Sequence, residues 1–203
     1  MTATRPRHNG KRAFLCALVA TTLPHLAWAA DPAAWRVTVV PSFEPRPAIY
    51  ESIPRSKTTF LAVARSTDYG ALEYATTRGA WRFARKLAET DGGRWLIEAN
   101  VEIRRDAKRV IDRILITGDD PLLPALALCS AFYTRFEPLL GDGFHVVIPD
   151  RNTIAMYPRL AGRIPPEEAA SLIEINRLST YPVSREVFRA NREGLVADGI
   201  LEE

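Results

Sequence analysis

The chain has 203 residues, of which 47% are apolar and 25% are charged, and its formal net charge is +3 at pH 7. This length is typical of a single domain, and the apolar fraction is sufficient for a buried core. The first 29 residues hold four basic and no acidic side chains, so the remainder of the chain has 23 basic and 24 acidic residues. Because that remainder has no excess of positive charge, the composition argues against a nucleic-acid partner.

The first 29 residues have the three parts of a secretory signal peptide. Four basic residues precede an apolar run over residues 13–29, which ends in Ala27-Trp28-Ala29, with small residues at the −3 and −1 positions of a cut. An uncleaved anchor is the alternative, but the run is interrupted by Pro24 and is short against the roughly 20 apolar residues that a membrane helix needs. We expect cleavage near Ala29, a periplasmic or secreted product, and no transmembrane segment in the mature chain.

The segment after the leader begins with a strand pattern. Residues 35–40 alternate between polar and β-branched side chains, which predicts a strand. Four prolines follow within residues 41–54, where they exclude a helix and disfavour a central strand. We therefore expect residues 30–58 to form a proline-rich N-terminal segment with one strand, and residues 59–203 to form a single α+β domain.

A strand and a helix are predicted at the start of that domain. Residues 59–65 are short and rich in apolar and β-branched side chains, which indicates a strand. Residues 80–88 place three alanines and Leu87 on one helical face, and we expect Gly92-Gly93 to end this helix.

Residues 94–104 carry the clearest strand pattern in the chain. Apolar residues such as Trp95 alternate with polar ones, as expected for a sheet that is wet on one side. The polar face consists of Glu98, Asn100, Glu102 and Arg104. Such a row is typical of a solvated face and also of a binding surface. Residues 110–117 fit either a strand or a helix, and we expect a strand that pairs with residues 94–104.

The second half of the chain reads as helices and hairpins in turn. An Asp-Pro pair predicts the start of a buried helix over residues 122–140. Residues 144–157 read as a hairpin around a polar turn, residues 165–178 as a helix with acids in its first turn, and residues 187–196 as a last small hairpin. The predicted fold is α+β, a mainly antiparallel sheet built from strand pairs with helices packed on one face.

A series of landmarks runs in order through residues 112–197. They are Gly118-Asp119-Asp120, then Ala127, Ser130 and Phe132, then Gly141 and Pro149, then Arg151-Asn152-Thr153-Ile154, Tyr181-Pro182-Val183-Ser184, Phe188 and Gly194-Leu195. With these landmarks the segment resembles the bacterial YtpQ-like family, whose function is unknown. The resemblance covers under half of the chain and implies an α+β fold. Members of the family are mostly cytosolic, so the leader is a departure, and the resemblance implies no catalytic residues.

Few chemistries are open to the mature chain. It keeps one histidine, His145, and one cysteine, Cys129, which cannot supply a usual zinc ligand set or an internal disulfide. The common nucleophile, phosphate-loop and metalloprotease motifs are absent from the sequence. A nucleophile–histidine pair would have to join His145 to Cys129 or to a serine such as Ser130. The expected roles are structural: a strand histidine and a small buried cysteine.

Two functions follow from these residues. The first is a non-enzymatic binding or accessory protein of the cell envelope, which would recognise an envelope protein or a cell-wall component through the polar row at residues 98–104. The alternative is an acid-dependent hydrolase that uses carboxylates near Asp119, Asp142 and Asp150 with His145. Caps and turns explain each of these acids singly, and we expect neither a metal nor a cofactor.

Overall fold

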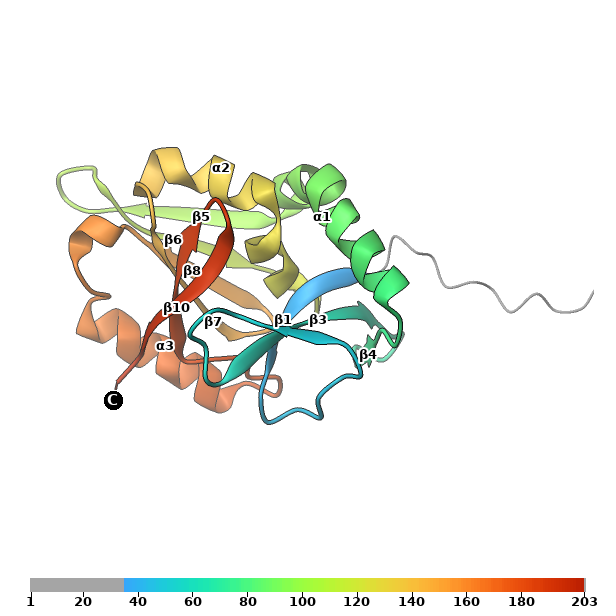
Figure 1. The fold of residues 1–203 in the computed structure, drawn as a ribbon. Coiled ribbons are helices and arrows are strands. Elements are labelled where there is room, and N and C mark those ends of the chain that lie inside the picture. The colour runs from blue at the N-terminus through green and yellow to red at the C-terminus, as the bar shows by residue number, and fades with distance from the viewer. Residues whose placement is uncertain (1–34, 203) are drawn as a thin grey trace, which may run out of the picture.

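The computed structural model describes residues 35–202, so the predicted signal peptide lies outside the described residues. This part of the chain forms two antiparallel sheets and three α-helices (Figure 1). No helix within residues 35–202 combines the length and the apolar character that crossing a bilayer requires. The antiparallel α+β class predicted from the sequence is confirmed.

The first sheet is built around β3, which pairs with three other strands. Its strands are β1 (Arg36–Pro41), β2 (Tyr50–Ser52), β3 (Thr59–Ser66) and β4 (Leu72–Tyr74). Ala64 of β3 pairs with Arg36 of β1 and with Tyr74 of β4, so β1 lies on one side of β3, and β2 and β4 lie on the other. Residues 30–58, expected to hold one strand, therefore contain β1 and the short β2, and both belong to this sheet.

The second sheet has six strands in the order β10-β9-β7-β8-β6-β5. They are β5 (Asn100–Arg105), β6 (Ile111–Thr117), β7 (His145–Asp150), β8 (Thr153–Tyr157), β9 (Glu186–Asn191) and β10 (Gly194–Ile200). Three hairpins, β5–β6, β7–β8 and β9–β10, supply all six strands. The two hairpins predicted near the turn at residue 151 and at the C-terminus are confirmed, as is the strand over residues 110–117.

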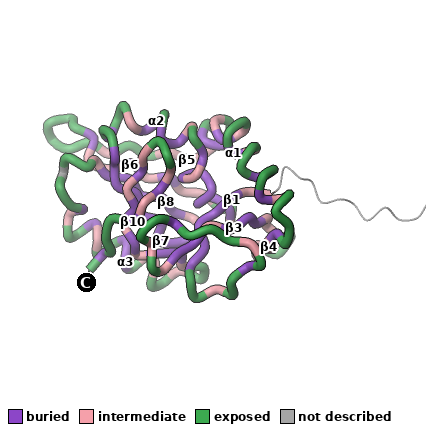
Figure 2. The backbone as a smooth tube through the Cα atoms, in the orientation of Figure 1, coloured by how far each residue is buried: buried purple, intermediate pink, exposed green. Residues whose placement is uncertain are grey.

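Both faces of the second sheet are covered by helices. Val146 and Ile148 of β7 lie in one apolar cluster with residues of α1 (Arg78–Glu98) and α2 (Ser130–Leu140). Val147 points to the opposite face, where it packs with residues of α3 (Pro166–Leu178). The central strands β7 and β8 are accordingly buried throughout (Figure 2). Helices were expected on one face, which describes α1 and α2, whereas α3 lies on the other.

The strand predicted over residues 94–104 is wrong in its first half. Helix α1 runs through both glycines to Glu98, and only from Asn100 does the chain become the strand β5. Trp95 and Leu96 are buried on the same helical face as Trp81, whereas Ile97 is 80% exposed. Ile97, which alternation placed on the same face as Trp95, therefore points to solvent, because residues two positions apart lie on opposite sides of a helix.

The helix predicted over residues 122–140 is divided at Cys129. Residues Leu123–Leu128 form a 3₁₀ helix, η2, and Cys129 is extended, with φ −86° and ψ 143°, before α2 begins. The predicted start is present, since the Asp120 carboxylate accepts a hydrogen bond from the Leu122 N–H at 2.9 Å. Pro124 lies in the first turn of η2, where a missing N–H breaks no helical bond, so the division comes from the extended backbone of Cys129 itself.

Glu168 anchors α3 to the sheet. Its carboxylate accepts hydrogen bonds from Arg104, from Arg113 at 3.0 Å and from the Tyr157 hydroxyl at 3.1 Å. Burial raises the pKa of Glu168, but the hydrogen bonds from Arg104 and Arg113 outweigh burial and hold the pKa below its ordinary value. The cluster therefore depends on an ionised carboxylate.

Replacing Glu168 with glutamine is expected to lower the free energy of unfolding by about 1–2 kcal/mol, because two guanidinium groups lose their shared anion. Urea unfolding at pH 7 measures the change. Glu167→Gln is the matched control, since Glu167 is exposed in the same helical turn. Equal losses of stability from the two substitutions would show that negative charge near the start of α3 is what stabilises the protein, and that the hydrogen bonds of Glu168 to the two arginines are not.

Candidate functional site

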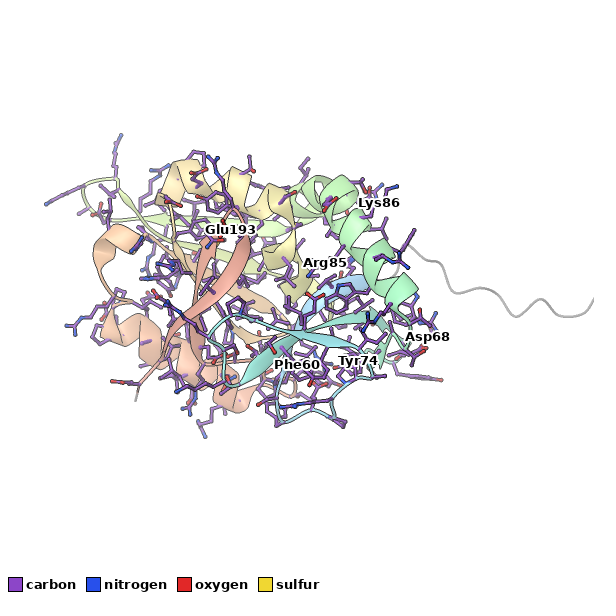
Figure 3. The ribbon with its side chains drawn as sticks, in the orientation of Figure 1. Phe60, Asp68, Tyr74, Arg85, Lys86 and Glu193 are labelled. Carbon is purple, nitrogen blue, oxygen red and sulfur yellow. The ribbon has the colours of Figure 1, made fainter. Side chains whose placement is uncertain are left out.

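A groove of about 490 Å³ lies where the two sheets approach each other. Its walls are β2, α1, the junction of η2 with α2, and the β9–β10 hairpin. Figure 3 labels Glu193 on the hairpin and Arg85 on α1, both of which line the groove. The groove therefore joins elements that are far apart in the sequence.

The groove has an apolar floor and a polar rim. Its floor is formed by buried side chains, which are Val37, Ile53, Ala88, Ala127, Cys129, Phe132, Tyr133, Ala190 and Leu195. Its rim carries exposed polar groups from four elements, among them Ser52, Arg85, Ser130 and Glu193. A concave apolar surface with a few polar groups around it is the usual form of a binding site.

Strand β10 presents an unpaired edge to this groove. In the part of the chain that the structure describes, β10 pairs only with β9. The Ala190 N–H of β9 donates to Phe144 of β7, so Ala190 turns its backbone groups away from its β10 partner, Leu195. The Leu195 N–H and C=O consequently point away from β9 as well, since the two residues form a non-hydrogen-bonded pair.

Strand β2 offers the second edge. The Val63 carbonyl accepts a hydrogen bond from the Ala75 N–H, on the side of β3 where β2 lies. The backbone groups of Leu61, two residues earlier in β3, therefore point toward β2 as well. Its partner Glu51 is then bonded to β3, and Ser52 directs its backbone groups outward. The two edges meet at one hydrogen bond of 2.9 Å, from the Ala197 N–H to the Pro54 carbonyl. Beyond that bond both edges border the groove.

A second hollow, of about 610 Å³, adjoins the groove and shares Glu51 with it. Its other lining residues are Ile49, Tyr50, Arg78, Trp81 and Arg82. Glu51 already forms an ion pair with Arg85, which also lies over the Trp81 ring at 5.5 Å from its centroid. Arg78 and Arg82 form no ion pair with any described residue. The hollow therefore carries uncompensated positive charge.

Cys129 in the groove floor is held in its protonated, poorly nucleophilic form. Its thiol donates to the Leu126 carbonyl at 2.9 Å, and burial raises the pKa of the thiol to about 11. Ser130 is exposed beside it, but His145 projects from β7 to the opposite face of the sheet, because its neighbour Val146 faces the α2 side. The nucleophile–histidine pair that would have required Cys129 or Ser130 is not formed.

The residues of the hydrolase alternative do not converge. Asp150 lies at the β7–β8 turn, where it accepts from the Asn152 N–H, and Asp119 follows Gly118 at that same end of the sheet. Asp142 lies at the other end, before β7, with His145, and accepts from the Tyr133 hydroxyl at 2.6 Å. No cluster of three potential metal-ligating residues occurs within residues 35–202.

The predicted polar row is present only in part. Asn100, Glu102 and Arg104 share one face of β5, but Glu98 is the last residue of α1. These side chains are largely engaged within the fold, since Asn100 bonds to Thr117, Glu102 to Arg113, and Arg104 to Asp112 and Glu168. A row of internally paired charges offers few free groups to a partner.

Sequence reasoning missed the groove. Its residues come from separate segments, and singly they read as ordinary core or turn residues. Two signals were available in the sequence: the basic residues Arg78, Arg82 and Arg85 at helical spacing, and the charged turn at Arg192-Glu193.

The comparisons with known proteins add no assignment, because no family model, no curated protein and no solved structure matches the chain. The YtpQ-like resemblance therefore stays a prediction.

Proposed function

We propose that this chain is a non-enzymatic binding domain of the cell envelope, and that its groove holds an extended segment of another polypeptide. The observation that carries the proposal is the pair of strand edges, at Leu195 and Ser52, beside an apolar floor. An extended peptide can satisfy such an edge with its own backbone while alternate side chains enter the floor.

The charges of the site restrict the ligand further. Arg78 and Arg82 have no ion-pair partner among the described residues, and their hollow continues from the groove at Glu51. A ligand with apolar residues at alternate positions, followed by an acidic residue, would match both hollows. Guanidinium groups favour carboxylates because they donate two parallel hydrogen bonds.

The leader supports the location in this proposal. A basic start, an apolar run and a small-residue cleavage site over residues 1–29 direct a chain to export, and the remaining sequence has nearly balanced charge. Envelope proteins that expose extended segments would then be the natural partners. A soluble glycan is disfavoured, because the floor offers apolar side chains rather than hydrogen-bonding groups.

Peptides selected from a displayed random library against the full chain provide the test. We expect selected peptides to show alternating apolar residues and an acid, and to bind with an affinity measurable by fluorescence anisotropy. N-methylation of every second residue, in the one register that faces the edge, is expected to weaken binding by about tenfold or more, because several backbone hydrogen bonds are lost.

A matched pair of substitutions locates the binding. Ser130→Trp fills the groove from an exposed position, whereas Thr134→Trp places the same side chain one turn later on α2, outside the groove. Only the first should abolish binding. Peptides that bind both variants equally, or that tolerate N-methylation in both registers, would overturn the proposed function.

A further inference from the structure

A second site lies on the α3 face of the six-stranded sheet, at the start of β7. Arg159, from the short 3₁₀ helix η3 (Arg159–Ala161), and Arg189, from β9, both pack over Gly143. The Nη1 atom of Arg159 and the Cδ atom of Arg189 each lie 3.3 Å from the position that a Cβ atom of residue 143 would occupy. Because Gly143 has no side chain and φ +68°, it allows the two arginines to approach each other.

These two arginines have no compensating partner. Among residues 35–202, neither guanidinium group forms a hydrogen bond or an ion pair, in contrast to Arg104, Arg113 and Arg151, which are all bonded to carboxylates. Two like charges side by side are unfavourable unless an anion lies between them. The arrangement therefore leaves a place for a negative group.

His145 is the third nitrogen donor of this place, and it becomes cationic when it is protonated. It is opposite Arg189 in the β7–β9 register, and its Nε2 atom is 3.7 Å from a carboxylate oxygen of Asp198. On its other side Tyr157 is its partner in β8, and the Tyr157 hydroxyl is held by Glu168 of α3. Burial lowers the pKa of His145, Asp198 opposes this effect, and Arg159 and Arg189 add to it. Within residues 35–202, Asp198 is thus the acid that faces His145 directly.

We propose that Arg159 and Arg189 form a binding site for an oxyanion, a phosphate, sulfate or carboxylate group, with His145 as its third donor. Guanidinium groups match such oxygens geometrically, and their planar forks bind them in pairs. The site is on the opposite side of the sheet from the groove, so it does not depend on the proposed function. It resembles the second hollow only in offering arginines that form no ion pair.

Anion binding and protonation of His145 are linked in this site. An anion between the arginines removes their repulsion of the imidazolium and adds an attraction, so it raises the pKa of His145. By reciprocity, the anion binds more tightly as the pH falls through that pKa. Sulfate is the suitable probe for the pH series, because its own charge does not change between pH 8 and pH 5.5.

NMR titration of the full chain measures this coupling. The His145 ring signals are identified by their loss in His145→Gln, which distinguishes them from those of His8 and His25. Sodium sulfate is expected to raise the pKa of His145 beyond the effect of sodium chloride at the same ionic strength. Phosphate and acetate arms at pH 6 then show whether the site prefers a tetrahedral or a planar oxyanion.

Arg159→Gln with Arg189→Gln is expected to weaken sulfate binding by about a hundredfold, about tenfold for each charged hydrogen-bonding group removed. The same double variant should have a higher His145 pKa without sulfate, since the repulsion is gone. Arg78→Gln with Arg82→Gln is the matched control and should keep the full response. The proposal is overturned if sulfate acts no more strongly than chloride, or if its effect survives loss of both arginines.

Discussion

Replacing Glu186 with glutamine is expected to lower the free energy of unfolding by about 3 kcal/mol, because a buried anion that accepts several hydrogen bonds is lost. The Glu186 side chain belongs to β9 in the six-stranded sheet, and it reaches the loop between β2 and β3 in the other sheet. It accepts from the Ser56 and Thr59 hydroxyls at 2.7 and 2.9 Å, and from the Lys57 N–H at 2.7 Å. Glutamine would turn an amide donor toward these donors.

The same carboxylate makes stability depend on pH. Burial raises the pKa of Glu186, but the hydrogen bonds from Lys57, Ser56, Thr59 and Thr58 outweigh burial and leave the pKa below its ordinary value. A lowered folded-state pKa means that the stabilisation is complete above the unfolded-state pKa and is lost as the pH falls through the folded-state value. We therefore expect the free energies of unfolding of wild type and Glu186→Gln to converge in the acidic range below about pH 4.

Urea unfolding of wild type and Glu186→Gln at pH 7 and at successively lower pH measures both effects. Glu193→Gln is the control, because its carboxylate is exposed at the β9–β10 turn and bonds to no described residue. A difference between wild type and Glu186→Gln that stays constant from pH 7 into the acidic range would contradict an ionised Glu186, and would assign the loss to packing.

The fold could be predicted from the sequence where local patterns and long-range pairing agree. The β7–β8 and β9–β10 hairpins have a polar turn between two apolar runs, and such a turn brings adjacent strands together whatever the rest of the chain does. The division into two sheets has no local signal. The contacts that hold the two sheets together are also long-range. Glu186 and Ala197 of one sheet bond to the β2–β3 loop region of the other, more than 120 residues away.

The candidate sites were harder to predict than the fold. Alternation correctly placed Asn100, Glu102 and Arg104 on one face of a strand, yet no pattern in the sequence shows that Glu168 from α3 would neutralise two arginines of that face. The groove depends on the separation of two sheet edges, and the oxyanion site on two arginines that meet over Gly143. Both are properties of tertiary packing between segments that carry no motif.

Gly92→Ala is expected to destabilise the protein by about 2–3 kcal/mol, although alanine is the better helix former. A Cβ atom at this position would lie 2.5 Å from the Cβ and 2.9 Å from the Sγ of Cys129, so α1 and the η2–α2 junction would be forced apart. Gly93→Ala is the matched control. Its Cβ would meet only Ala131, at 3.9 Å, and we expect it to stabilise the protein by about 0.5–1 kcal/mol.

A double-mutant cycle separates this contact from the helix propensity of the two residues. Cys129→Gly removes the clashing side chain, so Gly92→Ala in that background should be much less destabilising, or stabilising, with a coupling free energy of about 1–3 kcal/mol. Urea unfolding at pH 7 of wild type, the two single variants and the double variant gives this coupling free energy. Additive effects would mean that Gly92 does not allow the close approach. Coupling would show that Gly92, expected from the sequence to help end a helix, instead lets α1 pack closely against Cys129 and continue to Glu98.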